Sequence, residues 1–186
     1  MCGIVGSFNF LETAPAADLK AALTCLHQRG PDYQATFTKG PIALGHARLS
    51  ILDTSAAAHQ PMSSEDGRYT IVFNGEIYNF PQLRHELEGK GHTFSSDGDT
   101  EVLLKLFIHE GPSALQKLNG FFAFAVYDAQ EQSLFIARDR MGIKPLLFWH
   151  DAERLVFGSE LKALLALNVP RKLNHTALRL YLQLNY

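Results

Sequence analysis

The sequence predicts an α+β fold in which antiparallel sheets are covered by helices on the outside. Short apolar or alternating runs rich in Val, Ile, Phe and Tyr are typical of strands, and most of them follow one another without a helix between them. Turn sequences such as SEDGR at 64–68 and DAQEQ at 128–132 separate neighbouring runs. A doubly wound parallel sheet needs strands and helices in alternation, so the pattern favours antiparallel sheets.

The predicted strands share β-branched and aromatic residues, and they lie at 3–10, 42–48, 69–74, 121–128, 133–138, 145–149 and 154–158. Helical periodicity, with leucine or valine on one face, marks residues 15–28, 80–89 and 99–110. In the last of these helices Asp99 is expected as the N-cap, with Glu101 in the first turn. Another helix is predicted from 159 to the break at Pro170, and a final one from about Asn174.

Composition excludes several classes of protein. The chain has 186 residues, of which 46% are hydrophobic and 19% charged, and a formal net charge of −2, which is typical of a globular domain. A surface for nucleic acid would need clustered positive charge, so no nucleic-acid partner is expected. No apolar run reaches the ~18–20 residues of a membrane span. The beginning lacks the features of a signal peptide, and two cysteines are too few for a disulfide scaffold, so a cytoplasmic protein without membrane contact is expected.

The cysteine at position 2 is the most unusual feature of the sequence. Once Met1 is removed, the thiol of Cys2 and a free α-amino group belong to one residue, and an α-amine ordinarily titrates at about 7.7–8.0. Such an amine can act as the base for the thiol, as in enzymes with a terminal nucleophile. Two alternatives remain open. Cys2 could be a small buried hydrophobe, or a redox-sensing thiol, for which Cys25 offers no evident resolving partner.

Several further motifs follow Cys2 in a fixed order. They are MCGIVG at 1–6, RGPD at 29–32, HARLSILD at 46–53, QP at 60–61, FNGEIYN at 73–79, DTEV at 99–102, LNGFFAFAVYD at 118–128, ARDRMGIKPLLF at 137–148 and GSELKALL at 158–165. In these motifs the chain resembles the class II glutamine amidotransferase domain, an N-terminal-nucleophile hydrolase, and in particular the asparagine synthetase (glutamine-hydrolysing) type. The resemblance covers essentially the whole chain and implies a four-layer αββα sandwich of two antiparallel sheets flanked by helices.

The resemblance also implies the catalytic residues. Cys2 would be the nucleophile, while the side-chain amide of Asn74 and the backbone N–H of Gly75 would form the oxyanion hole. Arg48 would bind the carboxylate of glutamine, for which a guanidinium is well suited. Without the resemblance, Asn74-Gly75 would be interpreted as a hairpin turn at the end of a strand, and Arg48 as part of a surface ion pair.

Four more positions match the substrate-binding residues of the family. The backbone at Ile51 and Leu52 would contact the glutamine, and the carboxylates of Glu76 and Asp99 would hold its α-ammonium group. Gly98 departs from the family, which usually has serine there, and a small loss of local hydrogen bonding is expected. The histidines share no ligand spacing, so no metal site is expected.

The sequence therefore predicts hydrolysis of L-glutamine, with ammonia supplied to an ATP-dependent domain of the asparagine synthetase type. Residues 1–170 would form the glutaminase domain, and residues 171–186 the start of a linker or synthetase domain, from which the chain would have been trimmed. No cofactor is expected in this domain, since ATP and magnesium would bind only the missing one. Two alternatives stay open: a non-catalytic domain that binds glutamine or a partner, and a glutaminase half whose ammonia goes to an acceptor other than aspartate.

Overall fold

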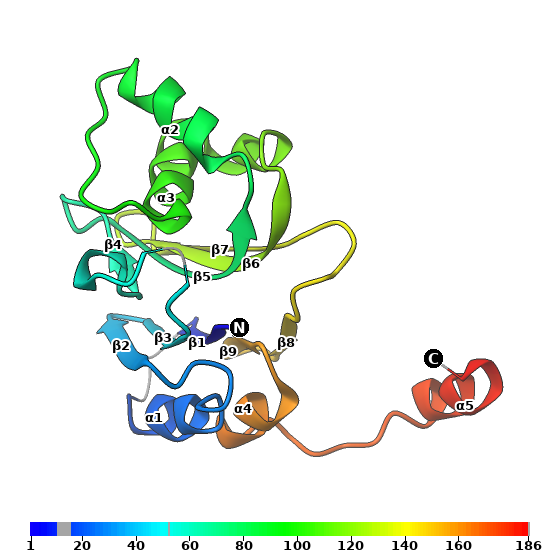
Figure 1. Cartoon of the computed structure of the whole chain (residues 1–186). Coiled ribbons are helices and arrows are strands. Elements are labelled where there is room, and N and C mark those ends of the chain that lie inside the picture. The colour runs from blue at the N-terminus through cyan, green and yellow to red at the C-terminus, as the bar shows by residue number, and fades with distance from the viewer. Residues whose placement is uncertain (11–15, 52, 186) are drawn as a thin grey trace.

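Four layers make up the body of the protein in the computed structural model (Figure 1). The residues that the structure describes are 1–10, 16–51 and 53–185. Two sheets lie face to face in the middle. The outer face of one sheet is covered by α2 (Phe80–Glu88) and α3 (Asp99–Glu110). The outer face of the other is covered by α1 (Ala16–Thr24) and α4 (Leu161–Ala166). The expected four-layer αββα sandwich is confirmed.

All strand pairs in both sheets are antiparallel. The five-stranded sheet has the order β2 (Tyr33–Lys39), β3 (Ile42–Arg48), β1 (Gly3–Asn9), β9 (Arg154–Gly158) and β8 (Leu147–His150). The four-stranded sheet has the order β4 (Met62–Ser63), β5 (Tyr69–Ile77), β6 (Gly120–Asp128) and β7 (Ser133–Arg138). Short 3₁₀ helices lie at Ala56–Ala58 and Gly111–Gln116. The strand that begins just after Cys2, β1, thus lies at the centre of its sheet, between β3 and β9.

Side chains that alternate along the strands separate the two faces of each sheet. On β3, Ala43 and Ala47 pack toward α1 and α4, whereas Leu44 packs between the two sheets. We call the cluster between the sheets the inner layer; it consists of Ile4, Ile42, Leu44, Val72, Ala123, Ala125, Tyr127 and Phe157. Most of these side chains are completely buried. The inner layer joins the two sheets into one core and fixes how they face each other.

Two strands were absent from the sequence-based prediction. In β2 the residues YQATFTK alternate weakly and are largely exposed, because β2 is an edge strand held by its pairing with β3. The two-residue strand β4 is too short for a periodic signal. Strand β5 is also longer than predicted, since it continues to Ile77, so Asn74 and Gly75 lie within a strand. The interpretation of Asn74-Gly75 as a hairpin turn is therefore wrong.

The expected N-cap of α3 also needs correction. Gly98 occupies the cap position, without a side-chain cap bond, and Asp99 is the first residue of the helix. The carboxylate of Asp99 instead accepts a hydrogen bond from the backbone N–H of Ile77, at 3.0 Å. Asp99 thus connects the start of α3 to the end of β5, which gives this carboxylate a place next to the strand that carries Asn74.

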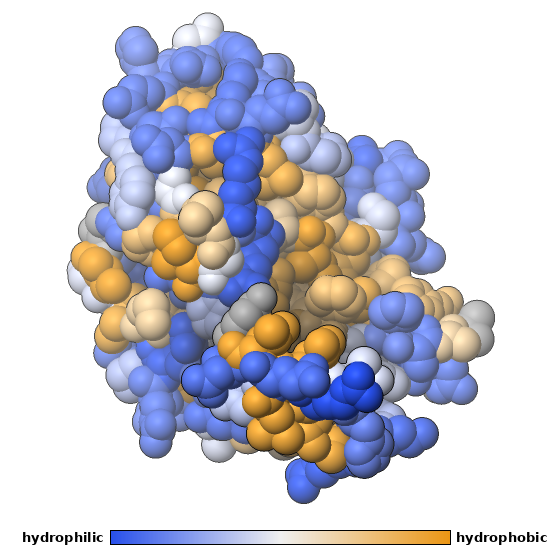
Figure 2. Space-filling view, turned by 90° about the vertical axis from the view of Figure 1, so that its right-hand side faces the viewer, coloured by the Kyte–Doolittle hydropathy of each residue, from blue (hydrophilic) through white to orange (hydrophobic). Residues whose placement is uncertain are grey.

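The last helix lies outside the four layers. Helix α5 (His175–Leu184) extends away from the sandwich, and none of its residues is buried (Figure 1). In Figure 2 it lies in the foreground, with hydrophobic side chains on its surface; those that are exposed are Leu178, Leu180, Tyr181, Leu182 and Leu184. No helix within residues 1–10, 16–51 and 53–185 has both the length and the apolar character needed to cross a membrane.

Candidate active site

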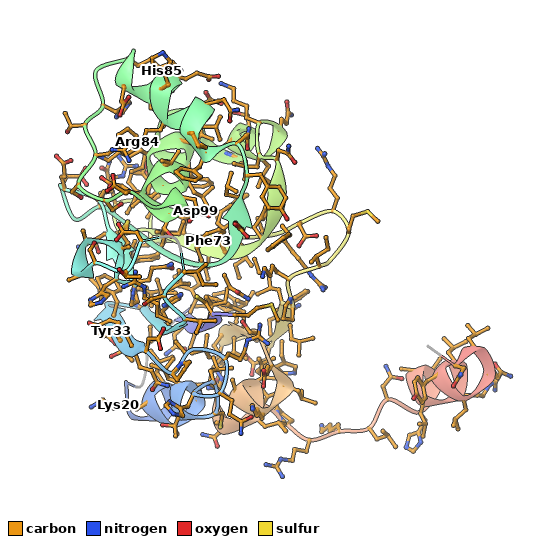
Figure 3. The ribbon with its side chains drawn as sticks, in the orientation of Figure 1. Lys20, Tyr33, Phe73, Arg84, His85 and Asp99 are labelled. Carbon is orange, nitrogen blue, oxygen red and sulfur yellow. The ribbon has the colours of Figure 1, made fainter. Side chains whose placement is uncertain are left out.

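A pocket of about 290 Å³ opens at the end of the inner layer nearest the N-terminus. Seven of the eight positions that the resemblance singled out line this pocket: Cys2, Arg48, Ile51, Asn74, Gly75, Glu76 and Asp99. The eighth, Leu52, lies outside the described residues. Figure 3 shows Phe73 on β5 and Asp99 at the start of α3 close to each other, and both contribute to the wall of the pocket.

Strand alternation explains why residues so distant in sequence converge. Cys2 lies two positions before Ile4, which belongs to the inner layer, and Arg48 lies four positions after Leu44 on the same face of β3. Asn74 follows Val72 of the inner layer by two positions on β5. Since residues i and i+2 point to the same face of a strand, all three side chains point between the sheets. They meet where the inner layer ends and the pocket begins.

Leu49 and Arg29 hold Cys2 in position at the start of β1. The Sγ atom of Cys2 lies 3.4 Å from the backbone nitrogen of Leu49 and 3.6 Å from its carbonyl oxygen. The guanidinium of Arg29 donates to the carbonyl oxygen of Cys2 at 2.9 Å and forms an ion pair with Glu160 at 3.1 Å. These contacts keep the thiol at the pocket. The contact of Arg29 with Cys2 joins residues 27 positions apart, so no local sequence pattern reports it.

The guanidinium of Arg48 is buried and is bound to backbone groups. It donates to the carbonyl oxygen of Ser55 at 2.9 Å and to that of Asp53. The carboxylate of Asp53 accepts hydrogen bonds from the backbone N–H groups of Ser55 and Asp97, at 2.8 and 3.0 Å. The interpretation of Arg48 as part of a surface ion pair is therefore wrong. Its positive charge lies at the pocket from the end of β3, and the loop that contains Asp53 and Ser55 holds it there.

The backbone of β5 directs donors into the pocket. The N–H groups of Phe73 and Ile77 both point away from β6, to the opposite edge of β5. The N–H of Phe73 donates there to the side chain of Gln60 at 2.6 Å, and the N–H of Ile77 donates to Asp99 at 3.0 Å. Gly75 lies midway between them, so alternation of the peptide groups points its N–H to the same edge. A Cβ at Gly75 would lie 2.4 Å from the carbonyl oxygen of Phe121, so a larger residue does not fit.

The amide of Asn74 is a second donor at the same place. The side chain is 1% exposed, and its Nδ2 atom has no hydrogen-bond partner among the residues that the structure describes. A buried donor without a partner costs about 1–3 kcal/mol, so such a group is typical of a site that receives a ligand. Together, the Asn74 amide and the Gly75 N–H form a pair of donors suited to an oxygen atom that gains negative charge.

Asp99 supplies negative charge on another wall of the pocket. Burial, together with a smaller effect of the neighbouring Glu76 charge, raises the pKa of its carboxyl group to about 6, although the hydrogen bond from Ile77 acts in the opposite direction. At neutral pH the group is therefore mostly ionised, although it is almost completely buried. A buried carboxylate is stabilised by a cation, and the Asp99 pocket wall is thus suited to a ligand with an ammonium group.

Some residues of the pocket were not recognised as functional from sequence. They are Gln60, Thr100, Phe121 and Lys144. The ammonium group of Lys144 lies 4.3 Å from the centre of the Phe121 ring and 3.4 Å from the sulfur of Met1. Burial lowers the pKa of Lys144. All four lie in motifs noted in the sequence (QP, DTEV, LNGFFAFAVYD and ARDRMGIKPLLF), but only the three-dimensional contacts reveal that they line the pocket.

His46 lies on β3 between Leu44 of the inner layer and Arg48 of the pocket. Burial lowers the pKa of His46 to about 4, and the nearby charges of Arg48 and His59 lower it as well. The hydrogen bond to Phe73 acts in the opposite direction. No group of three or more His, Cys, Asp or Glu side chains in the described part of the chain could hold a metal ion.

The pKa of His46 predicts weaker folding in acid. The unfolded chain takes up a proton near pH 6.5 but the folded protein only near pH 4, so the free energy of unfolding falls as the pH decreases through this window. At about 1.4 kcal/mol per pH unit the loss is about 3 kcal/mol. Asp99 titrates in the opposite direction, so the test is the difference between the wild type and His46→Gln in urea unfolding at pH 7 and pH 4.5. Parallel pH dependences of the two proteins would contradict the assignment.

Comparisons with known proteins identify the family of this chain. Residues 1–186 match the family model described as a glutamine amidotransferase domain. The chain belongs to this family. Asparagine synthetase [glutamine-hydrolyzing] 1 of Bacillus subtilis is 40% identical over 190 residues, which cover 100% of this chain and 30% of that protein. Asparagine synthetase B of Escherichia coli is 38% identical over 167 residues, 88% of this chain and 30% of the relative.

A solved structure shows the fold of this glutamine amidotransferase domain in another protein. The glutamine phosphoribosylpyrophosphate amidotransferase from Bacillus subtilis superposes with a TM-score of 0.75 and 24% identity, over 90% of this chain and 44% of that one. This likeness concerns the fold alone. The chain spans about 30% of the length of the curated relatives that it matches.

Proposed function

We propose that this glutamine amidotransferase domain hydrolyses L-glutamine to glutamate and ammonia through a glutamyl thioester on Cys2. The observation that supports the proposal most directly is the convergence of Cys2, Arg48, Asn74 and Asp99 on one pocket of about 290 Å³. Glutamine is a zwitterion with a neutral amide at its other end. A site for it therefore needs a cation, an anion, a nucleophile and donors for an oxyanion, and this pocket contains each of them.

Charged groups at one end of the pocket would bind the substrate. Arg48 would pair with the α-carboxylate, since a guanidinium suits a carboxylate in charge and shape. Asp99 and Glu76 would hold the α-ammonium group. The backbone at Ile51 would contact the bound glutamine; Leu52, outside the described residues, stays a prediction for the same role. This arrangement leaves the side-chain amide of glutamine directed at Cys2.

The reaction would proceed in two steps. The thiol of Cys2, deprotonated by its own α-amine, attacks the side-chain carbonyl carbon of glutamine, and the oxygen becomes an oxyanion bound by Asn74 and Gly75. The C–N bond then breaks, the leaving nitrogen takes the proton from the α-ammonium of Cys2, and ammonia and a thioester result. Water attacks the thioester next, releases glutamate and restores the thiol. No cofactor takes part in this scheme.

We further propose that the ammonia is used by an ATP-dependent domain of the asparagine synthetase type, in which ATP and magnesium would bind. Residues 1–170 would be the glutaminase domain and residues 171–186 the start of the connection to that second domain. The separation of α5 from the four layers supports this boundary (Figure 1). An acceptor other than aspartate remains the alternative. We propose a cytoplasmic location, where a reducing environment keeps the thiol free.

The proposal is tested by measuring glutamate release together with the identity of the first residue. We expect activity from protein that begins at Cys2, as read from its intact mass, and none from protein that retains Met1, because the amine is then part of a peptide bond. Activity with Met1 in place would contradict the role of the amine. Inactive protein that begins at Cys2 would favour a non-catalytic domain that binds glutamine or a partner.

The pKa of Asp99 predicts how glutamine binding depends on pH. Its carboxyl group has a pKa of about 6 in the empty pocket, and only the ionised form attracts an ammonium group. We therefore expect the KM for glutamine to rise as the pH falls below about 6, and to be about tenfold higher at pH 5 than at pH 7. The charges of glutamine itself do not change in this range.

The matched control for this prediction is Asp99→Asn. It keeps the shape of the side chain but cannot ionise, so its KM should be high and nearly independent of pH between 5 and 7.5. Steady-state kinetics of both proteins across this range measure the effect. A wild-type KM that changes no more than that of Asp99→Asn would contradict the assignment of Asp99 to the ammonium group.

A further inference from the structure

One edge of β5 lacks a neighbouring strand where the active site is built. Strand β4 pairs only with Thr70 and Ile71, and β5 continues for six residues beyond this contact. The peptide groups of Phe73, Gly75 and Ile77 face that open edge. An unpaired strand edge leaves its backbone groups without fixed positions unless other groups bind them. The accuracy with which Gly75 and Asn74 are placed therefore depends on what holds this edge.

Two side chains replace the missing strand at Phe73. Its N–H donates to the Oε1 atom of Gln60 at 2.6 Å, and its carbonyl oxygen accepts from the Nε2 atom of His46 at 3.1 Å. The other end of Gln60 donates to the hydroxyl of Thr100 at 3.2 Å, next to Asp99. We call Gln60, Phe73 and His46 the Phe73 clamp. Phe73 directly precedes the two oxyanion donors, Asn74 and Gly75, in the sequence.

His46 is an unusual residue for its place. It is 0% exposed and shares a face of β3 with Leu44 of the inner layer, where a hydrophobic side chain would fill the space. Because its partner is a carbonyl oxygen, Nε2 must carry the proton, and Nδ1 then has no partner among the described residues. Burying a polar ring costs free energy that one hydrogen bond only partly offsets. Stability alone gives no reason for histidine here.

The contact of His46 joins the two halves of the active site. His46 lies on β3, opposite Ile4 of β1, the strand that begins just after Cys2. Its hydrogen bond reaches across the inner layer to β5 of the other sheet. The nucleophile and the oxyanion donors belong to different sheets, and this bond fixes the distance between them at a point close to both.

We propose that His46 and Gln60 are positioning residues that hold the backbone of Phe73 so that Asn74 and Gly75 point at the oxyanion. The inference rests on the proposed function, in which these two donors stabilise the tetrahedral intermediate. Such donors act only at about 2.7–3.1 Å from the oxygen, and a displacement of about 1 Å can cost 100-fold in rate. His46 does not line the pocket, and both side chains act through their hydrogen bonds to the backbone of β5.

The test compares two substitutions of His46 that differ in one hydrogen bond. His46→Leu removes the donor, whereas the amide of His46→Gln can still donate to Phe73. We expect the kcat of His46→Leu to fall at least tenfold, with KM within threefold of the wild type, and His46→Gln to recover most of this loss. Rates are expressed per reactive Cys2: intact mass counts the chains that begin at Cys2, and the folded fraction from circular dichroism excludes unfolded protein.

Leu44→Ala is the matched control. It lies on the same face of β3 two residues earlier, and it creates a cavity in the inner layer but removes no hydrogen bond of Phe73. It should lower the melting temperature and leave kcat per reactive Cys2 unchanged. If Leu44→Ala loses as much kcat as His46→Leu, the effect is general loosening and the proposal is overturned. If His46→Leu does not fold, Gln60→Met removes the other half of the clamp, and an unchanged kcat in that variant overturns the proposal.

Hydrogen–deuterium exchange separates this inference from the proposed function. Backbone amides of residues 73–77 should exchange faster in His46→Leu than in His46→Gln or Leu44→Ala. Should the wild type release no glutamate, the proposed function fails, and the exchange still decides on the clamp: faster exchange supports it, equal exchange overturns it. In an active protein, equal kcat values for His46→Leu and the wild type overturn it.

Discussion

The Cys2→Ala variant is expected to release no measurable glutamate from glutamine while it still binds glutamine. Alanine cannot attack the amide carbonyl, so neither the thioester nor ammonia forms. The groups that we assign to binding, Arg48 and Asp99, remain in place on other walls of the pocket. The loss therefore affects the chemical step and not the affinity, and removal of a nucleophile commonly costs several orders of magnitude in rate.

Two measurements check this expectation on the same preparations. A glutamate-release assay gives the rate, and isothermal titration calorimetry gives the dissociation constant for glutamine. Cys25→Ala is the matched control, since Cys25 follows α1 and does not line the pocket. That variant should keep wild-type turnover. Normal turnover in Cys2→Ala, or a loss of turnover in Cys25→Ala, would contradict the assignment of the nucleophile.

The site residues came from the resemblance, and strand periodicity explains why their side chains converge. Once Ile4, Leu44 and Val72 are recognised as inner-layer residues, the alternation of a strand places Cys2, Arg48 and Asn74 on the same side. The order of the motifs supplied the roles, which periodicity alone does not give. The fold class followed in the same way from adjacent strand runs separated by turns. These features need no knowledge of which strands pair.

What the sequence did not reveal depends on pairing and on contacts across the sheets. Strand β2 was missed because its side chains are mostly exposed, so that only its hairpin with β3 defines it. The end of β5 was placed too early because Asn-Gly is typical of turns, while here the pairing with β6 overrides that preference. The bonds of Gln60 and His46 to Phe73 join residues 13 and 27 positions apart. No local pattern reports such contacts.

The Asn74→Ala variant should lose activity without losing stability. Removal of one oxyanion donor raises the barrier by about 2.7–4 kcal/mol, so kcat should fall about 100- to 1,000-fold while KM changes little. The amide of Asn74 has no partner among the described residues, and its removal eliminates a buried unsatisfied donor. We therefore expect the melting temperature to stay the same or to rise, which is typical of a residue retained for function at the expense of stability.

Asn79→Ala provides the contrast that makes this prediction specific. Asn79 has both ends of its amide bonded, donating to the carbonyl of Lys117 at 2.9 Å and accepting from the N–H of Asn119 at 2.9 Å. Its substitution should lower the melting temperature and leave kcat unchanged, because it lies outside the pocket. Steady-state kinetics and thermal unfolding of both variants give four values. A stability loss in Asn74→Ala as large as that in Asn79→Ala would mean that the Asn74 amide serves the fold, and the oxyanion donor would have to be sought elsewhere on β5.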